Sequence, residues 1–155
     1  MNIYALSSGR GPSGIAIVRI SGKDTLNICK KLTKLKNLKA NEINYCKFYN
    51  PNNNNVIDPE SLLLWFPKPN SYTGDDLAEL QIHGSNAVIN SLLQVLSEQQ
   101  NCRLAEPGEF TKLAFQNDKI DLLKAESIGD LVHAETELQR QQAIKLIQGK
   151  ASNYY

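Results

Sequence analysis

The chain has 155 residues, 41% of them apolar, which is enough for one well-buried core but not for several domains. Seventeen basic and sixteen acidic residues leave a formal charge of +1, so no global charge draws the chain to nucleic acid or to an anionic membrane. The three cysteines are widely spaced and form no C-x-x-C pair, which argues against a disulfide framework and against a thiolate metal site. With no signal peptide or membrane span visible, we expect a cytoplasmic protein.

The pattern of residues 2–66 predicts four strands and one helix. Residues 2–6 and the β-branched run at 15–20 predict strands, with a glycine-rich loop between them. Residues 24–38 place apolar residues among lysines, which predicts a helix with one solvated face; a phosphate-binding patch is the alternative interpretation of Lys30, Lys31, Lys34, Lys36 and Lys39. The Asn/Pro run at 50–55 predicts a turn between strands near 43–49 and 61–66.

From residue 62 onward the pattern predicts the strand already placed near 61–66, a second strand, an edge strand, two shorter helices and one long helix. The continuous apolar run at 62–66 is typical of a strand buried on both faces, and residues 77–82 alternate as a second strand does. Ser85 or Asn86 is a suitable N-cap for a helix, an edge strand follows at 102–105, and Pro107 opens a short helix that ends near Asn117. Asp121 would cap a long helical stretch to residue 149.

Several familiar motifs fail when their context is tested. Residues 9–14 match G-x-G-x-x-G, but a strand follows instead of a helix, and Pro12 removes a backbone donor. No glycine precedes either Gly-Lys pair at the P-loop spacing, so Asp118-Lys119-Ile120-Asp121 has no phosphate site to complete as a guanine-reading motif. Two histidines are too few for a histidine-rich metal site, and we expect His83 to shape a strand-to-helix turn.

Four segments carry a specific resemblance across most of residues 2–132. They are Gly9-Arg10-Gly11 with Arg19-Ile20-Ser21-Gly22; Trp65-Phe66-Pro67 with Asn70-Ser71-Tyr72-Thr73-Gly74; Glu79-Leu80 with His83-Gly84; and Pro107-Gly108-Glu109-Phe110-Thr111, which runs on through Asn117-Asp118-Lys119-Ile120-Asp121-Leu122 to Ala125-Glu126. In order and spacing the chain resembles the amino-terminal part of the MnmE (TrmE) family of tRNA-modification GTPases.

The resemblance implies an α+β fold with a mixed sheet and packed helices, similar to the folate-binding domain of glycine-cleavage aminomethyltransferases. Residues 1–119 would form a tetrahydrofolate-binding and dimerisation domain, and residues 120–155 would begin a helical domain. It also implies a homodimer, and in the whole protein a flavoprotein partner, MnmG, and tRNA. The GTPase domain, with its GTP, K⁺ and Mg²⁺, and a carboxy-terminal cysteine motif would lie outside this chain, which we therefore do not expect to be catalytic alone.

In this family 5-formyl-tetrahydrofolate or 5,10-methylene-tetrahydrofolate is the one-carbon source, and the resemblance implies contacts from Arg19, Glu79 and Lys119. A carboxylate such as Glu79 can accept the N–H donors along one edge of a pterin, and two cations can meet the carboxylates of the glutamate tail. Which cation meets the ring and which the tail stays open. The alternatives are a solvent-facing Glu79 on an alternating strand, and a structural ion pair for Arg19, whose buried guanidinium needs an anionic partner.

Two rival functions stay open beside the folate-binding module. One is a free-standing folate-dependent aminomethyl- or formyltransferase, which would need a general acid or base in its pocket. The other is a structural dimerisation domain that binds no ligand.

Overall fold

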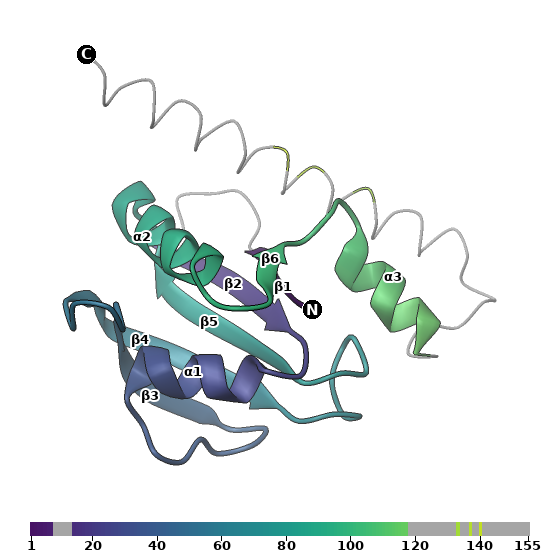
Figure 1. Cartoon of the computed structure of the whole chain (residues 1–155), viewed down its shortest axis with the longest axis horizontal. Coiled ribbons are helices and arrows are strands. Elements are labelled where there is room, and N and C mark those ends of the chain that lie inside the picture. Colours follow the sequence, from purple (N-terminus) through teal and green to yellow (C-terminus); the bar gives the residue numbers. More distant parts are fainter. Residues whose placement is uncertain (8–13, 118–132, 134–136, 138–139, 141–155) are drawn as a thin grey trace.

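The structure, a computed structural model, describes residues 1–7 and 14–117 together with His133, Glu137 and Arg140. This part of the chain contains six strands and three helices (Figure 1). In chain order they are β1 (Asn2–Leu6), β2 (Ile15–Ser21), α1 (Thr25–Thr33), β3 (Ile43–Tyr49), β4 (Val56–Phe66), β5 (Leu77–His83), α2 (Asn86–Ser97), β6 (Cys102–Leu104) and α3 (Glu109–Gln116). The long helix predicted from Asp121, and with it the predicted domain at 120–155, lies outside the described residues apart from those three.

All six strands join one sheet in the order β3-β4-β5-β2-β1-β6. Every neighbouring pair is antiparallel except β1 and β6, which are parallel. The prediction of an α+β fold with a mixed sheet is therefore confirmed. The central strands β5 and β2 are far apart in sequence, and their full seven-residue ladder runs from Ile15 and His83 to Ser21 and Leu77.

Helices α1 and α2 lie on the same face of the sheet and bury the main core against it (Figure 1). The fully buried members come from alternate positions of the strands and from one stripe of each helix, as the periods of strand and helix require. They include Val18, Ile20, Leu63, Leu80, Leu32, Leu92 and Leu96.

Within residues 1–7 and 14–117, the opposite face of the sheet is covered only near β1. There α3 buries Phe110 against Ile3, Ala5 and Ala105, and Tyr72 packs at the margin of this small cluster. The rest of this face, over β2, β5, β4 and β3, carries no helix in the described part of the chain.

The prediction that the strand at 62–66 is buried on both faces is wrong for one face. Leu63 and Trp65 face the helices and are buried, whereas Leu62, Leu64 and Phe66 face the open side and stay partly exposed. Three further apolar side chains on this side are exposed: Ile15 by 55%, Ile43 by 49% and Tyr45 by 78%. The open half of the sheet is therefore a largely apolar surface.

Element boundaries differ from the predictions at two places. The helix predicted over 24–38 ends at Thr33, because Lys34 adopts a left-handed conformation with φ 60° and its N–H bonds to the carbonyl of Lys30. Strand β4 begins at Val56, five residues before the predicted start. The predicted N-cap of α2 is confirmed, since the Ser85 hydroxyl accepts the N–H of Val88 at 3.3 Å.

The lysines in and after α1 behave as a solvated face. Lys31, Lys34, Lys36 and Lys39 are exposed, and the Lys34 ammonium lies 4.2 Å from the centre of the Tyr49 ring. None of the helices described is both long and apolar enough to cross a membrane.

Candidate functional site

A row of paired residues crosses five strands on the sheet face opposite α1 and α2. Glu79 in β5 is paired in register with Arg19 in β2 and with Leu64 in β4. Beyond them, Arg19 pairs with Ala5 and Leu64 pairs with Ile43. Residues in register point to the same face of a sheet, so the two charged residues lie between apolar neighbours. They also lie where the part covered by α3 meets the open part.

Arg19 and Glu79, two of the three predicted site residues, form an ion pair across β2 and β5. Nη2 of Arg19 donates to Oε1 of Glu79 at 3.3 Å, and the side chains are only 21% and 22% exposed. Glu79 is therefore the anionic partner that Arg19 was expected to need. The Nε of Arg19 is buried and has no hydrogen-bond acceptor in the described protein, so the guanidinium keeps an unused donor.

Two aromatic rings hold the Arg19 guanidinium. Its Cζ lies 5.0 Å from the centre of the Tyr72 ring and 5.7 Å from that of Phe110, distances at which a cation is attracted by the ring face. The Tyr72 hydroxyl is 3.0 Å from the hydroxyl of Thr111, which links the loop after β4 to α3. The guanidinium is therefore positioned by two elements that lie outside its own strand pair.

The loop that carries Tyr72 is tied to β2 and to the end of α3 by polar contacts at residues that follow Tyr72. The Ser21 hydroxyl lies 2.8 Å from that of buried Thr73 and donates to the carbonyl of Asp76 at 2.9 Å. Asn117 donates from its side chain to the carbonyl of Thr73 at 2.6 Å. Gly74, with φ 85°, leaves room for Asn117: an added Cβ would lie 2.6 Å from the Asn117 Cβ. The stiff loop predicted at 67–74 thus has a fixed position beside the ion pair.

Lys119, the third predicted site residue, lies outside the described residues. Its contact with a ligand stays a prediction. Of the predicted set, the structure brings Arg19 and Glu79 together. Tyr72 and Phe110 were identified in the sequence only as parts of motifs, because no local pattern reveals which aromatic rings will meet an arginine from another strand.

A second charged pair lies at the far end of β5. Asp58 in β4 is fully buried and accepts the backbone N–H of His83 at 2.7 Å, while both of its carboxylate oxygens lie 2.8 and 2.9 Å from Nδ1 of the His83 ring. Burial alone would raise the pKa of Asp58, but hydrogen bonds from the backbone of His83 and Glu60 and from the imidazole outweigh it and hold that pKa below its ordinary value.

The sequence offered one signal for this second pair. Aspartate is depleted within strands, and Asp58 lies inside β4, opposite the irregular pairing between Cys46 and Phe48 in β3. His83 does end the strand before the turn to α2, as expected. Its contact with Asp58 was not anticipated, because the two residues are 25 positions apart in the sequence.

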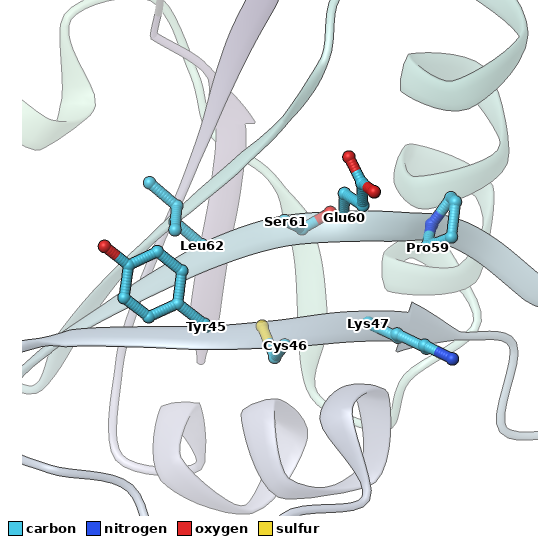
Figure 2. Close-up of a pocket in the computed structure, with 7 residues that line it drawn as sticks. All are labelled: Tyr45, Cys46, Lys47, Pro59, Glu60, Ser61 and Leu62. Atoms are coloured by element: carbon cyan, nitrogen blue, oxygen red, sulfur yellow. The ribbon is translucent and has the colours of Figure 1, made fainter.

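Two adjoining depressions lie on the open half of the sheet and share Glu60, Ser61 and Leu62. The larger, of about 630 Å³, is shown in Figure 2, where the Tyr45 ring lies beside Leu62 while Glu60 and Lys47 point in different directions. The smaller, of about 230 Å³, is lined by Gly14, Ile15, Glu60, Ser61, Leu62, Gln81, Ile82 and His83. Neither includes Arg19 or Glu79, but Gln81 is the next residue after Glu79 on the same face of β5.

This arrangement offers hydrogen-bond donors and acceptors rather than a metal centre. In the described part of the chain no three His, Cys, Asp or Glu side chains come together as metal ligands. The paired guanidinium and carboxylate present donors and an acceptor side by side, which suits a flat heterocycle with both kinds of group along one edge.

Comparison with known proteins gives a family match over residues 2–119, to the model described as the GTP-binding protein TrmE N-terminus. The chain is 57% identical over 155 residues to the tRNA modification GTPase MnmE of Pelagibacter ubique, a match that covers all of this chain and 35% of that protein. It is 42% identical over 153 residues to the MnmE protein of Parvibaculum lavamentivorans, covering 99% of this chain and 35% of the relative.

A eukaryotic relative is as similar to this chain as the Parvibaculum protein is. The chain is 42% identical over 159 residues to a mitochondrial tRNA modification GTPase of Dictyostelium discoideum, covering 99% of this chain and 31% of that protein. The chain thus spans about a third of the length of the curated relatives it matches.

Proposed function

We propose that this chain, which belongs to the family of TrmE amino-terminal domains of tRNA-modification GTPases, binds a reduced folate through Arg19 and Glu79 and pairs with a second copy of itself. The ligand is 5-formyl-tetrahydrofolate or 5,10-methylene-tetrahydrofolate. One observation carries the proposal: a guanidinium and a carboxylate lie side by side on a largely apolar sheet face, at the edge of its uncovered half.

The ion pair has properties of a binding site rather than of a tight structural bridge. Its single contact of 3.3 Å is long for a charge-assisted hydrogen bond, and the Nε of Arg19 is still unused. A ligand that supplies acceptors to the guanidinium and donors to the carboxylate would satisfy both without leaving a buried charge alone. A purely structural pair would be expected to make two parallel contacts, as Arg103 and Glu109 do elsewhere in this chain.

The pterin end of a reduced folate fits these two groups. Its amino group and adjacent ring N–H are donors that a carboxylate such as Glu79 can accept together, and its carbonyl oxygen is an acceptor for Arg19. Because Arg19 contacts Glu79 directly, both residues would meet the same end of the ligand. We therefore propose that Arg19 meets the ring, and Lys119 keeps its predicted role as a further cation for the ligand.

The open half of the sheet supports self-association. Tyr45, Ile43 and Ile15 are exposed by 78%, 49% and 55%, and Leu62, Leu64 and Phe66 are partly exposed beside them. Contiguous exposed apolar surfaces of this kind are typical of protein interfaces. A second copy placed over this face would remove the apolar surface from water and enclose the adjoining ion pair.

In the longer proteins of the family, we propose that this module holds the folate whose one-carbon unit is used to modify a wobble uridine in tRNA. The GTPase activity and the flavoprotein partner MnmG would belong to that assembly. The module itself supplies binding and dimerisation, and its fold would resemble the folate-binding domain of aminomethyltransferases.

Calorimetric titration with 5-formyl-tetrahydrofolate tests the proposal. We expect the 155-residue chain to bind, and both Glu79→Gln and Arg19→Met to weaken binding by roughly tenfold or more, since each removes hydrogen bonds from a charged group. Arg140→Met and Glu42→Gln, which change exposed charges elsewhere, serve as matched controls and should leave binding unchanged. Absence of binding by a dimeric sample would reject the folate site and leave the structural dimerisation domain.

The rival transferase function has its own readout. Turnover of a folate one-carbon donor by the isolated chain would favour a free-standing aminomethyl- or formyltransferase. We expect binding without turnover.

A further inference from the structure

We propose that the imidazole of His83, held by Asp58, binds the acidic aminobenzoylglutamate end of the ligand whose pterin end meets Arg19 and Glu79. The inference rests on the proposed folate site and extends it along β5. It assigns to His83 and Asp58 a ligand-binding role in a second subsite.

The orientation of the His83 ring is the first argument. The backbone N–H of His83 already donates to Asp58. The last backbone donor of β5 and the buried carboxylate therefore have partners without any contact from the His83 ring. The ring makes two further contacts with the same carboxylate although the side chain is 55% exposed and gains little from packing. A carboxylate that orients an exposed imidazole is the arrangement by which proteins present a ring nitrogen to a ligand.

The protonation pattern of the pair follows from its contacts. Asp58 also accepts the N–H of Glu60 at 3.0 Å, and its lowered pKa keeps it ionised, so it can only accept hydrogen bonds. Nδ1 of His83 must therefore carry a proton, and Nε2 is the ring nitrogen available to a ligand.

The position of His83 along the strand is the second argument. Glu79, Gln81 and His83 alternate with residues that face the helices, so all three project from the open face. Four residues of strand span about 13 Å. A bicyclic pterin is shorter than this, whereas a pterin extended by an aminobenzoylglutamate is long enough to reach both ends.

A depression with suitable walls occupies the part of this span nearest to His83. The smaller depression, of about 230 Å³, runs from Gln81 to His83 and is flanked by Ile15 on β2 and Leu62 on β4. Apolar side chains on both sides of a polar strip suit a flat aromatic ring with polar groups at its ends.

The charges of the lining residues indicate that His83 would bind the acidic end of the ligand. Among its lining residues His83 is the one side chain that can carry a positive charge. Arg19 is engaged with Glu79 and lies outside the depression. Glu60 opposes an acidic ligand, but it is exposed, so water and salt screen its repulsion.

The test compares two ligands on the full 155-residue chain. One is 5-formyl-tetrahydrofolate, and the other is 5-formyl-6-methyltetrahydropterin, which lacks the aminobenzoylglutamate. We expect His83→Ala to weaken binding of the folate by about three- to tenfold and to leave the pterin unaffected, since the lost contact is a partly exposed charge-assisted hydrogen bond. Arg19→Met should weaken the binding of both ligands.

His83→Gln, which keeps a polar side chain, is the second variant. His133→Ala is the matched control, because His133 is exposed and lies outside the depression.

Glu60→Gln tests the chemical class of the bound end. If that end is acidic, removing the Glu60 charge should tighten folate binding by about twofold and should leave the pterin unchanged. Weaker folate binding by this variant would mean that the subsite takes a donor group, which contradicts the proposal.

The possible results separate the two proposals. If the chain binds neither ligand, the folate site itself is wrong and the His83 subsite falls with it. If the chain binds folate but both His83 variants bind it as the unaltered chain does, or lose both ligands equally, the folate site stands and the His83 subsite is overturned.

Discussion

Arg103 in β6 and Glu109 in the first turn of α3 form an ion pair with two parallel contacts, Nη1 to Oε1 at 2.8 Å and Nη2 to Oε2 at 2.6 Å. Glu109 also accepts the backbone N–H of Glu106 at 2.8 Å, which closes the start of the helix. The next residue of α3, Phe110, is the one that packs on the Arg19 guanidinium. The edge of the sheet is therefore connected to the candidate site through this helix.

Arg103→Met should lower the free energy of unfolding by about 1 kcal/mol, because the pair is bidentate but partly exposed. Urea unfolding followed by circular dichroism measures this change. The matched control is Arg140→Met, which removes a more exposed pair with Glu137 and should cost less than about 0.5 kcal/mol. Equal losses in the two variants would contradict the role given to Arg103.

Acid should destabilise the fold through Asp58 and Glu109. The hydrogen bond from Arg103 is the main cause that lowers the pKa of Glu109, and the hydrogen bonds described above lower that of Asp58 despite its burial. Groups with a lowered folded-state pKa stabilise the protein fully above the unfolded value of about 4, and this contribution is lost as the pH falls through the folded value. Unfolding free energies measured in urea should be level between about pH 5 and 7 and should fall below about pH 4.

Asp58→Asn isolates the part of this effect that belongs to the buried carboxylate. An amide cannot accept all the hydrogen bonds that Asp58 accepts, so we expect a loss of roughly 2 to 3 kcal/mol at pH 7 and a smaller further loss on acidification. An unchanged slope below pH 4 would show that Asp58 does not contribute to the acid sensitivity.

Gly74→Ala should destabilise the loop that carries Tyr72. The glycine has φ 85°, and an added Cβ would lie 2.6 Å from the Cβ of Asn117, so backbone strain and a steric clash act together. We expect a loss of about 1 to 3 kcal/mol in thermal or urea unfolding. Gly14→Ala is the matched control, because nothing lies within 4 Å of its added Cβ; a comparable loss there would point to a generic glycine effect.

Tyr45→Glu should reduce self-association without unfolding the chain. Its side chain is 78% exposed on the open face, so a charge there costs little in the monomer but would be buried in an interface. Light scattering coupled to size-exclusion chromatography should show a lower mass than for the unaltered chain at the same concentration. Lys31→Glu, on the exposed side of α1, should leave the mass unchanged; the reverse pattern would place the interface on the helical face.

The three thiols should react slowly with a disulfide reagent at pH 8. Burial raises the pKa of Cys46 and of Cys102 to about 11 and raises that of Cys29, which is fully buried, still further. We expect Cys46 and Cys102 to react first and Cys29 only after denaturant is added. Rapid labelling of Cys29 in the folded chain would show that α1 opens easily.

Local pattern explains why most elements were predictable. The alternation of residues 77–82, the Ser85 cap and the apolar stripe of α2 are each set by neighbours a few positions away, so the sequence reveals them directly. The early end of α1 was not predictable in this way. Lys34 is an ordinary helix former, and only its contacts in the folded chain place it in a left-handed conformation.

By itself the sequence determined the fold class, the order of the elements, the family and the two charged residues Arg19 and Glu79 as candidates. Only the tertiary structure decided that these two lie in register, that Tyr72 and Phe110 flank the guanidinium, and that Asp58 orients His83. The physical reason is that folding brings together residues far apart in the chain, 60 positions for Arg19 and Glu79 and 25 for Asp58 and His83. The pairing of strands is fixed by the packing of the whole sheet rather than by any local pattern.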